Sequence, residues 1–432
     1  MSVTGGPSRL RVGFVMLHTS PLDVPGTKDA GGMNVVVLAQ AEALARAGHA
    51  IRIFTRRADP AAAARVELTP GLEVVHIDAG PARLLAKAEH EPVMAEFGAQ
   101  LAAELAREPA DVLHAEHWFS GIAALPVARR TGTPLVQSFH SIAVPEGSAL
   151  PGERPESPGR LAGERRLARE ADALIAVSEA ERGTIVADLG GAPERVCVVP
   201  LGVDTELFRP CHTRECAERD EWFARGGAAE VIAVGRLHPL KGFDLALDAL
   251  AAIPAARRPA LRIVGAPPPD GDDYARGLHE QAARLGLLGS VAFEGALPRP
   301  ELAARIRRAT LMVVPSHTET FGLVALEAAA SGVPVVARAA GGLREAVRDG
   351  ETGVLVRGDD PREWAAVIAA LLDDPERMAA MSRAARAHAL GRSWGASAES
   401  LLAAYRGLLA ARAGAGPVVS DGAAGARATR CG

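Results

Sequence analysis

Short apolar segments alternate with longer, alanine-rich amphipathic segments along almost the whole chain. RVGFVML and AIRIFTR have the length and composition of buried strands, and VVVLAQAEALARAG, which separates them, has helical periodicity. Alternation of this kind is typical of parallel strands that helices cover on both faces. It predicts an α/β fold built from βαβ units.

The alternation runs through the chain twice, with a loose stretch near 209–229 between the two series. We therefore predict two Rossmann-like parallel-sheet domains, over 1–208 and 209–392. An amphipathic segment over 393–412 predicts a C-terminal helix, and the small, polar residues of 413–432 predict a disordered tail. In open α/β sheets ligands bind beyond the carboxyl ends of the strands, so the site should lie in the cleft between the domains.

The composition argues against two classes of partner. A net charge of -4 with 23% charged residues gives no basic surface for nucleic acid. No apolar stretch reaches the roughly 18 to 20 residues that span a membrane, and the N-terminal segment is no signal peptide, so we expect a cytoplasmic protein. The many prolines and glycines of 145–163 predict an irregular loop that faces the cleft.

Lysine is rare, since only three of the 48 Lys and Arg residues are lysines. One of them, Lys241, follows Arg236 in the loop that leaves the apolar run VIAVGRL. Arg can hold two oxygens at once and Lys supplies a compact charge, so this pair at a strand end suits a diphosphate. The alternative is an ordinary solvated loop.

A second candidate segment lies after the first predicted strand, where a long loop ends in Gly31 and Gly32 before a helical pattern. Glycines at a helix start allow backbone N–H groups to approach an anionic or polar ligand closely. Alternatively, they serve turn geometry alone.

Glu319 and Glu327 flank a Phe-Gly turn in SHTETFGLVALEAAASG, a predicted loop and helix that follow the apolar run TLMVVPS. Carboxylates accept two hydrogen bonds at once, so Glu327 suits the diol of a ribose and Glu319 the hydroxyls of a second sugar. The helix N-terminus between them can face a phosphate. Together these groups indicate a nucleotide sugar. The alternative places Glu319 in an exposed turn and Glu327 on the wet face of the helix.

These motifs resemble the retaining glycosyltransferases of family four, which have the GT-B fold. ETFGLVALE, GRLHPLKG and VVPLGVDTELFRP carry the resemblance, which extends to about residue 410. The front loop HTSPLDVPGTKDAGGMNV is similar to that of members that move N-acetylglucosamine from UDP-GlcNAc to 1D-myo-inositol 3-phosphate, the first step of mycothiol biosynthesis.

The resemblance implies roles for three sets of residues. The catalytic residues would be His140, Arg236, Lys241 and Glu319. Those that bind the donor would be Gly32, Arg236, Lys241, Leu297, Glu319 and Glu327. Those that bind the acceptor would be His18, Asp29, Asn34, Lys87, His117, Ser141 and Arg160. The expected chemistry needs no cofactor and no catalytic metal, a structural magnesium ion stays open, and a homodimer is common in the family.

One motif departs from the family. HAEHWFSG carries Glu116 and His117 where the family usually shows His-Tyr, and a carboxylate beside a phosphate is unfavourable unless it points away or orients a neighbour. Another acceptor, such as an aminocyclitol or a thiol compound, therefore stays open, as does another NDP-sugar. An epimerase on the same scaffold and a nucleotide-sugar sensor without turnover are further alternatives. A dehydrogenase is disfavoured because no GxGxxG follows either first strand.

Overall fold

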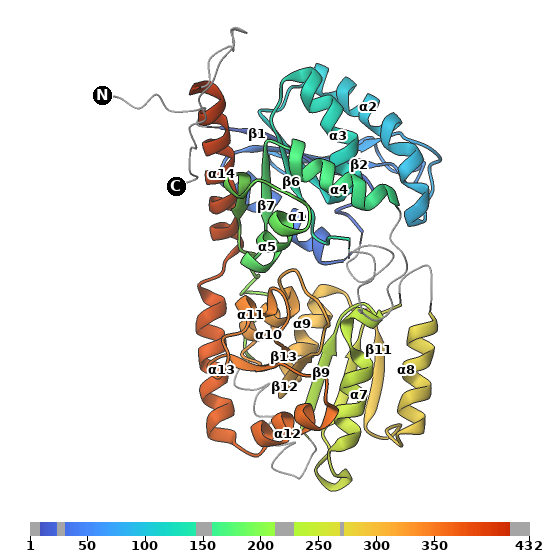
Figure 1. The fold of residues 1–432 in the computed structure, drawn as a ribbon, viewed down its shortest axis with the longest axis vertical. Coiled ribbons are helices and arrows are strands. Elements are labelled where there is room, and N and C mark those ends of the chain that lie inside the picture. Colours follow the sequence, from blue (N-terminus) through green and yellow to red (C-terminus); the bar gives the residue numbers. More distant parts are fainter. Residues whose placement is uncertain (1–8, 24–30, 144–157, 212–228, 268–271, 415–432) are drawn as a thin grey trace, which may run out of the picture.

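Two α/β domains lie one above the other along the long axis of the molecule (Figure 1). The structure is a computed structural model, and it describes residues 9–23, 31–143, 158–211, 229–267 and 272–414. Among these residues, no helix combines the length and the apolar character that a membrane span requires.

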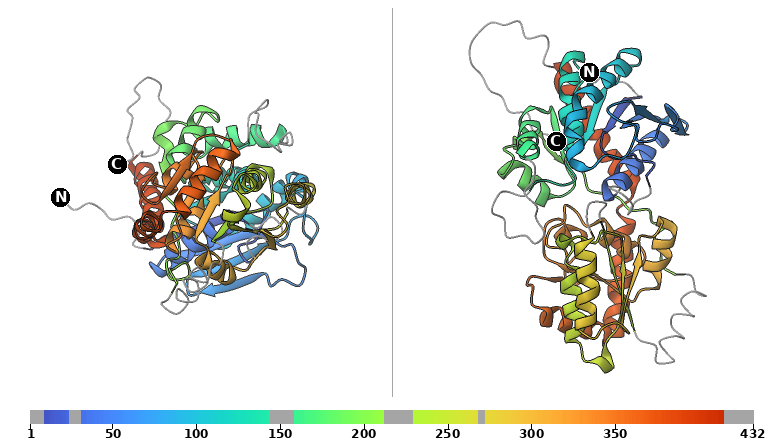
Figure 2. Two further views of the ribbon diagram at one scale, coloured as in Figure 1. Left: turned by 90° about the horizontal axis from the view of Figure 1, so that it is seen from below. Right: turned by 90° about the vertical axis from the view of Figure 1, so that its right-hand side faces the viewer.

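The N-terminal domain is a sheet in the order β3-β4-β2-β1-β5-β6-β7-β8 with helices on its faces (Figure 2). Its strands are β1 (Arg11–Met16), β2 (Ala50–Arg56), β3 (Arg65–Thr69), β4 (Leu72–Ile77), β5 (Val112–Glu116), β6 (Leu135–Ser138), β7 (Ala173–Ala176) and β8 (Val196–Val198). Its helices are α1 (Gly32–Arg46), α2 (Met94–Arg107), α3 (His117–Thr131), α4 (Pro158–Glu170) and α5 (Glu179–Ala187).

The C-terminal domain is a parallel sheet in the order β11-β10-β9-β12-β13-β14. Its strands are β9 (Glu230–Val234), β10 (Ala260–Val264), β11 (Val291–Gly295), β12 (Leu311–Val314), β13 (Val335–Arg338) and β14 (Gly353–Val356). Its helices are α7 (Phe243–Ala252), α8 (Asp273–Arg284), α9 (Arg299–Arg308), α10 (Leu323–Ala330), α11 (Leu343–Ala346), α12 (Pro361–Leu372) and α13 (Pro375–Leu390). The prediction of two parallel-sheet α/β domains is confirmed.

The strands β3 and β4 are the part of the first sheet that the sequence reading missed. They form a hairpin at the sheet edge, where β3 runs antiparallel to β4 and Gly71 turns the chain with φ of +86°. In β3 exposed and half-buried residues alternate, as expected of an edge strand with one solvated face. The N-terminal sheet is therefore parallel except at this edge.

Helix α4 corrects the expectation of an irregular loop over 145–163. The helix begins at Pro158, so Arg160 lies in its first turn, while 144–157 lie outside the described residues. Proline is well suited to the first position of a helix, where no N–H is needed. Pro158 of this segment therefore begins a helix and does not lie in an irregular loop.

The chain crosses between the domains twice, and the second crossing leads into α14 (Trp394–Gly414). This helix packs against α1 of the N-terminal domain (Figure 1). It ends at Gly414, two residues beyond the predicted end at 412. The predicted disordered tail lies outside the described residues from 415 onward. Tyr405 of α14 is fully buried, and its hydroxyl lies 2.7 Å from Nδ1 of His114. Helix α14 thus belongs to the N-terminal domain.

Replacing Tyr405 by phenylalanine should destabilise the protein, because it leaves Nδ1 of the buried His114 without its partner. The expected cost is about 1 to 3 kcal/mol of unfolding free energy. Thermal unfolding measures it as a lower Tm. Arg412→Ala is the matched control on the same helix, since Arg412 pairs with Asp172 on an exposed surface and its loss should leave Tm nearly unchanged. Equal melting of Tyr405→Phe and wild type would contradict the role given to the hydroxyl.

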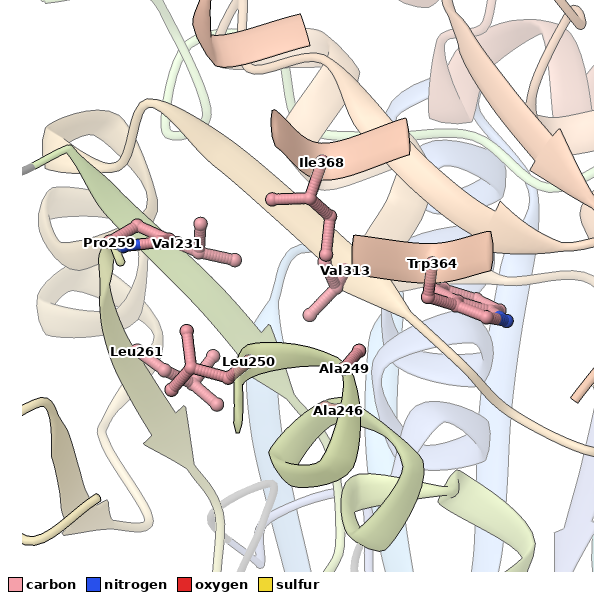
Figure 3. A pocket seen from close by; sticks show the side chains of 9 residues that line it. All are labelled: Val231, Ala246, Ala249, Leu250, Pro259, Leu261, Val313, Trp364 and Ile368. Carbon is pink, nitrogen blue, oxygen red and sulfur yellow. The ribbon is translucent and has the colours of Figure 1, made fainter. Parts of the chain in front are cut away.

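Apolar side chains of the C-terminal domain line a small pocket between α7, α12 and the sheet (Figure 3). Trp364 and Ile368 of α12 face apolar side chains of α7 and of strands β9, β10 and β12, and the remaining cavity has a volume of only about 10 Å³. The indole N–H of Trp364 donates to the carbonyl of Gly358, 3.0 Å away. This dense core holds the sheet whose strand ends carry the candidate site.

Candidate active site

The C-terminal domain contributes two loops that are bonded to each other. The backbone N–H of His317, after β12, donates to the carbonyl of Leu240 in the loop that follows β9, at 2.8 Å. Nζ of Lys241 lies 2.5 Å from Oε1 of Glu319, and the Ser316 hydroxyl donates to the same oxygen at 3.0 Å. Two residues predicted separately for the donor site, Lys241 and Glu319, are thus in direct contact.

Two glycines that the sequence reading missed support the Glu319 loop. The N–H of Gly342 donates to the Glu319 carbonyl at 2.9 Å. Gly341 has φ of +47°, and a Cβ there would come within 2.1 Å of the same carbonyl oxygen. A side chain at Gly341 would therefore push the loop away. The Ala-Ala-Gly-Gly stretch after β13 was the available sequence signal, because paired glycines mark close approaches of backbone.

Glu327 lies in the middle of α10 and is buried, which rules out the alternative that placed it on a wet helix face. Oε1 of Glu327 is 2.8 Å from Nη1 of Arg299, at the start of α9. Burial raises the pKa of the Glu327 carboxyl, and the charge and hydrogen bond of Arg299 oppose this. Arg299 also stacks over Phe208, with Cζ 4.9 Å from the ring centroid. The sequence reading missed Arg299, although it directly follows the GALP turn.

Arg236 and Leu297 are the other donor-site predictions in this domain. Arg236 is exposed on the loop after β9, and Leu297 is partly buried between β11 and α9. Both lie just beyond the carboxyl end of a strand, as the prediction required.

Gly32 is the first residue of α1, and the loop before it is held by Asn34. The side-chain amide of Asn34 donates to the Thr19 hydroxyl at 2.9 Å and to the Ser20 carbonyl at 2.6 Å, and its oxygen accepts from the N–H of Gly31 at 3.2 Å. A Cβ at Gly32 would meet no atom within 4 Å. Asn34, predicted to contact the acceptor, is buried, and its side chain holds the glycine turn. Its neighbour in the prediction, Asp29, lies outside the described residues.

Of the remaining acceptor-site predictions, His18, His117 and Ser141 follow strands of the N-terminal domain, whereas Arg160 lies in the first turn of α4. His18 follows β1 and its ring centroid is 4.4 Å from that of His117, at the start of α3. Arg160 donates from Nη2 to the hydroxyl and to the carbonyl of Ser141, both at 3.0 Å. Glu164 holds Nε of Arg160 at 2.8 Å. The structure therefore pairs His18 with His117, and Ser141 with Arg160. Lys87 begins a short 3-10 helix (Lys87–Glu89).

His140 connects the two domains. It follows β6, and its backbone carbonyl accepts a hydrogen bond of 3.3 Å from the hydroxyl of Thr320, the residue after Glu319. Thr320 in turn accepts, through its carbonyl, a bond of 2.6 Å from the Ser178 hydroxyl. The predicted strand-end histidine of one domain thus lies beside the carboxylate loop of the other.

His117 and His140 share an unusual backbone conformation. Their φ angles are +70° and +58°, the positive values among non-glycine residues of the described chain. Left-handed backbone at such residues costs free energy and clusters at functional sites, where surrounding contacts hold it in place. Both residues lie on the strand-end surface that faces the other domain.

Among the described residues, no group of three or more His, Cys, Asp and Glu side chains is placed to hold a metal ion.

Family models match both halves of the chain. The model described as Glycosyltransferase Family 4 matches residues 30–207, and the one described as Glycosyl transferases group 1 matches 216–388. The chain is 43% identical to D-inositol 3-phosphate glycosyltransferase 1 of Catenulispora acidiphila over 418 residues, which cover 94% of this chain and 98% of the relative. This chain is a family four glycosyltransferase.

Two further matches agree with this assignment. D-inositol 3-phosphate glycosyltransferase of Thermobispora bispora is 43% identical over 91% of this glycosyltransferase and 94% of its own length. The sucrose-phosphate synthase from Thermosynechococcus elongatus superposes with a TM-score of 0.84 at 28% identity, over 93% of this chain and all of that one. The GT-B fold predicted for this glycosyltransferase is confirmed.

Proposed function

We propose that this glycosyltransferase moves N-acetylglucosamine from UDP-N-acetylglucosamine to 1D-myo-inositol 3-phosphate with retention of configuration, the first step of mycothiol biosynthesis. The relatives with 43% identity over nearly the whole chain are named for transfer to D-inositol 3-phosphate, which supports the acceptor. The observation that carries a transfer reaction is the contact of the Glu319 loop with His140 across the domain boundary. Action in the cytosol and assembly as a homodimer belong to the same proposal and rest on the family resemblance.

The donor would lie along the C-terminal domain. Glu327 would bind the ribose diol, the backbone around Leu297 the uracil, and Glu319 the hydroxyls of the transferred sugar. Lys241, paired with Glu319 at 2.5 Å, would exchange part of this contact for the diphosphate when the donor binds. Arg236 and the first turn of α10 would add positive potential at the same place.

Catalysis would rest on position and charge. The leaving diphosphate takes the proton of the attacking acceptor hydroxyl, and the acceptor attacks from the face that the diphosphate leaves. Lys241 and Arg236 stabilise the negative charge that grows on the departing UDP, and preorganised cations do this without reorganisation during the reaction. The two domains hold acceptor and donor in contact, which lowers the entropic part of the barrier.

The acceptor phosphate would be bound by Arg160, Ser141 and Lys87. Arg160 and Ser141 are already 3.0 Å apart, and Glu164 fixes the guanidinium in that place. Arginine with a neighbouring hydroxyl suits the tetrahedral oxygens of a phosphate monoester. His117 would lie where the family usually has tyrosine.

The test is the release of UDP from UDP-N-acetylglucosamine with 1D-myo-inositol 3-phosphate, with free myo-inositol and without acceptor. We expect UDP to be released only when the phosphorylated acceptor is present together with the donor. Arg160→Ala should raise the KM for this acceptor by about tenfold or more, because a charge-assisted contact is lost, and leave the KM for the donor unchanged. Equal turnover of inositol and its phosphate would contradict the acceptor.

A further inference from the structure

Glu116 and His140 form a buried acid–histidine pair in the N-terminal domain. Glu116 is the last residue of β5, and in the parallel register it lies beside Ser138, the last residue of β6. The left-handed backbone at His140 turns its ring back toward this neighbour, and Oε2 of Glu116 accepts a hydrogen bond from Nε2. The side chains are 1% and 11% exposed, respectively. The bond therefore lies almost wholly out of water.

A buried carboxylate needs a compensating positive charge, and His140 is the group placed to supply it. His114 is the other histidine near Glu116, with Nδ1 at 3.5 Å from Oε1. Both ring nitrogens of His114 are engaged by neutral hydroxyls, those of Tyr405 at 2.7 Å and Ser138 at 2.8 Å. Burial lowers the pKa of His114, which keeps this ring neutral.

The charges around His140 favour its protonated form. Burial by itself lowers the pKa of His140, but the charge and the hydrogen bond of Glu116, with a smaller contribution from Glu181, raise it above the ordinary value. Glu181, on α5, is itself buried, and burial raises its pKa to about 7. Its Oε2 accepts from the N–H of Val177 at 2.7 Å. The charges of two carboxyl groups thus act on one imidazole, and one of the two, Glu116, is bonded to it.

We propose that Glu116 is a positioning residue of the transfer reaction: it holds His140 by Nε2 as a charged imidazole, so that Nδ1–H is the donor left for the substrate. This inference rests on the proposed function. The Thr320 hydroxyl holds the backbone of His140 beside Glu319, so that the ring, the backbone and the loop of the opposite domain are fixed together. A cation at this place would face the transferred sugar and the diphosphate that leaves from it.

This role also accounts for the departure of HAEHWFSG from its family. A carboxylate at position 116 need not contact an acceptor phosphate, because its bonded oxygen is turned to His140. Its effect on substrates would be indirect, through the charge and the orientation of the imidazole.

The experiment uses Glu116→Gln, which keeps the size of the side chain and removes its charge. The titration of His140 is followed by NMR in protein with isotope-labelled histidine, and His140→Gln identifies the signal. We expect the pH at which His140 loses its proton to fall by at least one unit in Glu116→Gln, a tenfold change in proton affinity. Glu181→Gln, the matched control, should shift it less, because no hydrogen bond to His140 is lost.

Kinetics then show whether the charge serves transfer. If the reaction needs the imidazolium, kcat/KM falls as pH rises through the pKa of His140, and this fall should move to lower pH in Glu116→Gln by the same amount as the NMR titration. A purely structural role would lower the rate equally at every pH. Rates that fall in parallel, without a shift of the profile, would overturn the proposal.

The proposal can still be tested if the Glu116→Gln protein does not fold or if wild type transfers no sugar. If Glu116→Gln does not fold, wild type alone suffices, because a His140 that loses its proton below about pH 6.5, the ordinary value for histidine, overturns the proposal. If wild type transfers no sugar to any acceptor, the proposed function fails in the UDP assay. In that case UDP-N-acetylglucosamine should still shift the NMR signal of His140 in wild type, and shift it less in Glu116→Gln. A wild-type signal that does not move when this donor is added would contradict the inference.

Discussion

Lys241→Ala should raise the activation free energy of UDP-sugar transfer by about 2 to 4 kcal/mol, which lowers kcat/KM roughly 30- to 900-fold. The expected loss is large because the ammonium would meet charge that develops on the leaving diphosphate in the transition state. It would appear mainly in kcat, since the uracil and ribose contacts stay intact. Steady-state kinetics of UDP release measure it. Turnover within about threefold of wild type would show that this assignment is wrong.

Two variants separate the charge of Lys241 from other effects. Lys241→Arg keeps a positive charge but replaces the compact ammonium beside Glu319 by a planar fork, so it should recover only part of the rate. Arg276→Ala removes a cation on the exposed surface of α8, where it pairs with Asp273, and should leave the kinetics unchanged. If Arg276→Ala lost as much rate as Lys241→Ala, the effect would reflect net charge alone.

Glu327→Ala should weaken the binding of UDP by about 10- to 150-fold, because the ribose loses a charged hydrogen-bond acceptor. The effect should be the same for UDP and for UDP-N-acetylglucosamine, since both carry the ribose. Isothermal titration calorimetry measures both affinities directly. The expected pattern differs from that of Lys241→Ala, which acts on the rate.

Arg299→Ala is the control for Glu327, because the carboxylate is 2.8 Å from this guanidinium. If Glu327 binds ribose itself, Arg299→Ala should keep more affinity for UDP than Glu327→Ala does. An unchanged Kd in Glu327→Ala would contradict the ribose role and leave the carboxylate as a structural partner of α9.

The strand pattern predicted the architecture because buried parallel strands are almost uniformly apolar. All six strands of the C-terminal sheet follow from runs such as VIAVGRL and TLMVVPS. The hairpin β3–β4 escaped notice because an edge strand alternates between polar and apolar residues and has weaker contrast. The alternation of RVELT and the following Pro-Gly were the signals for it.

The site was predictable where it depends on strand ends and not where it depends on backbone conformation. Lys241 and Glu319 lie in loops that follow predicted strands, so their meeting at one edge of the sheet could be inferred. Glu116 and His140 are 24 residues apart, and they meet beyond the neighbouring strands β5 and β6, where His140 has a positive φ. The sequence around His140 gives no signal that this histidine adopts a left-handed backbone conformation. The sequence showed Glu116 as an anomaly but not its partner.

Helix α14 has a consequence for the order of events at the ribosome. The C-terminal sheet is made from a continuous stretch of chain, β9 to β14, which can pair as soon as it has been synthesised. The N-terminal sheet begins first but lacks Tyr405 and the packing of α14 on α1 until α14 has been synthesised, after all strands of the C-terminal sheet. The N-terminal domain, although its first strand is made first, can therefore reach its final packing only after the C-terminal sheet has been synthesised.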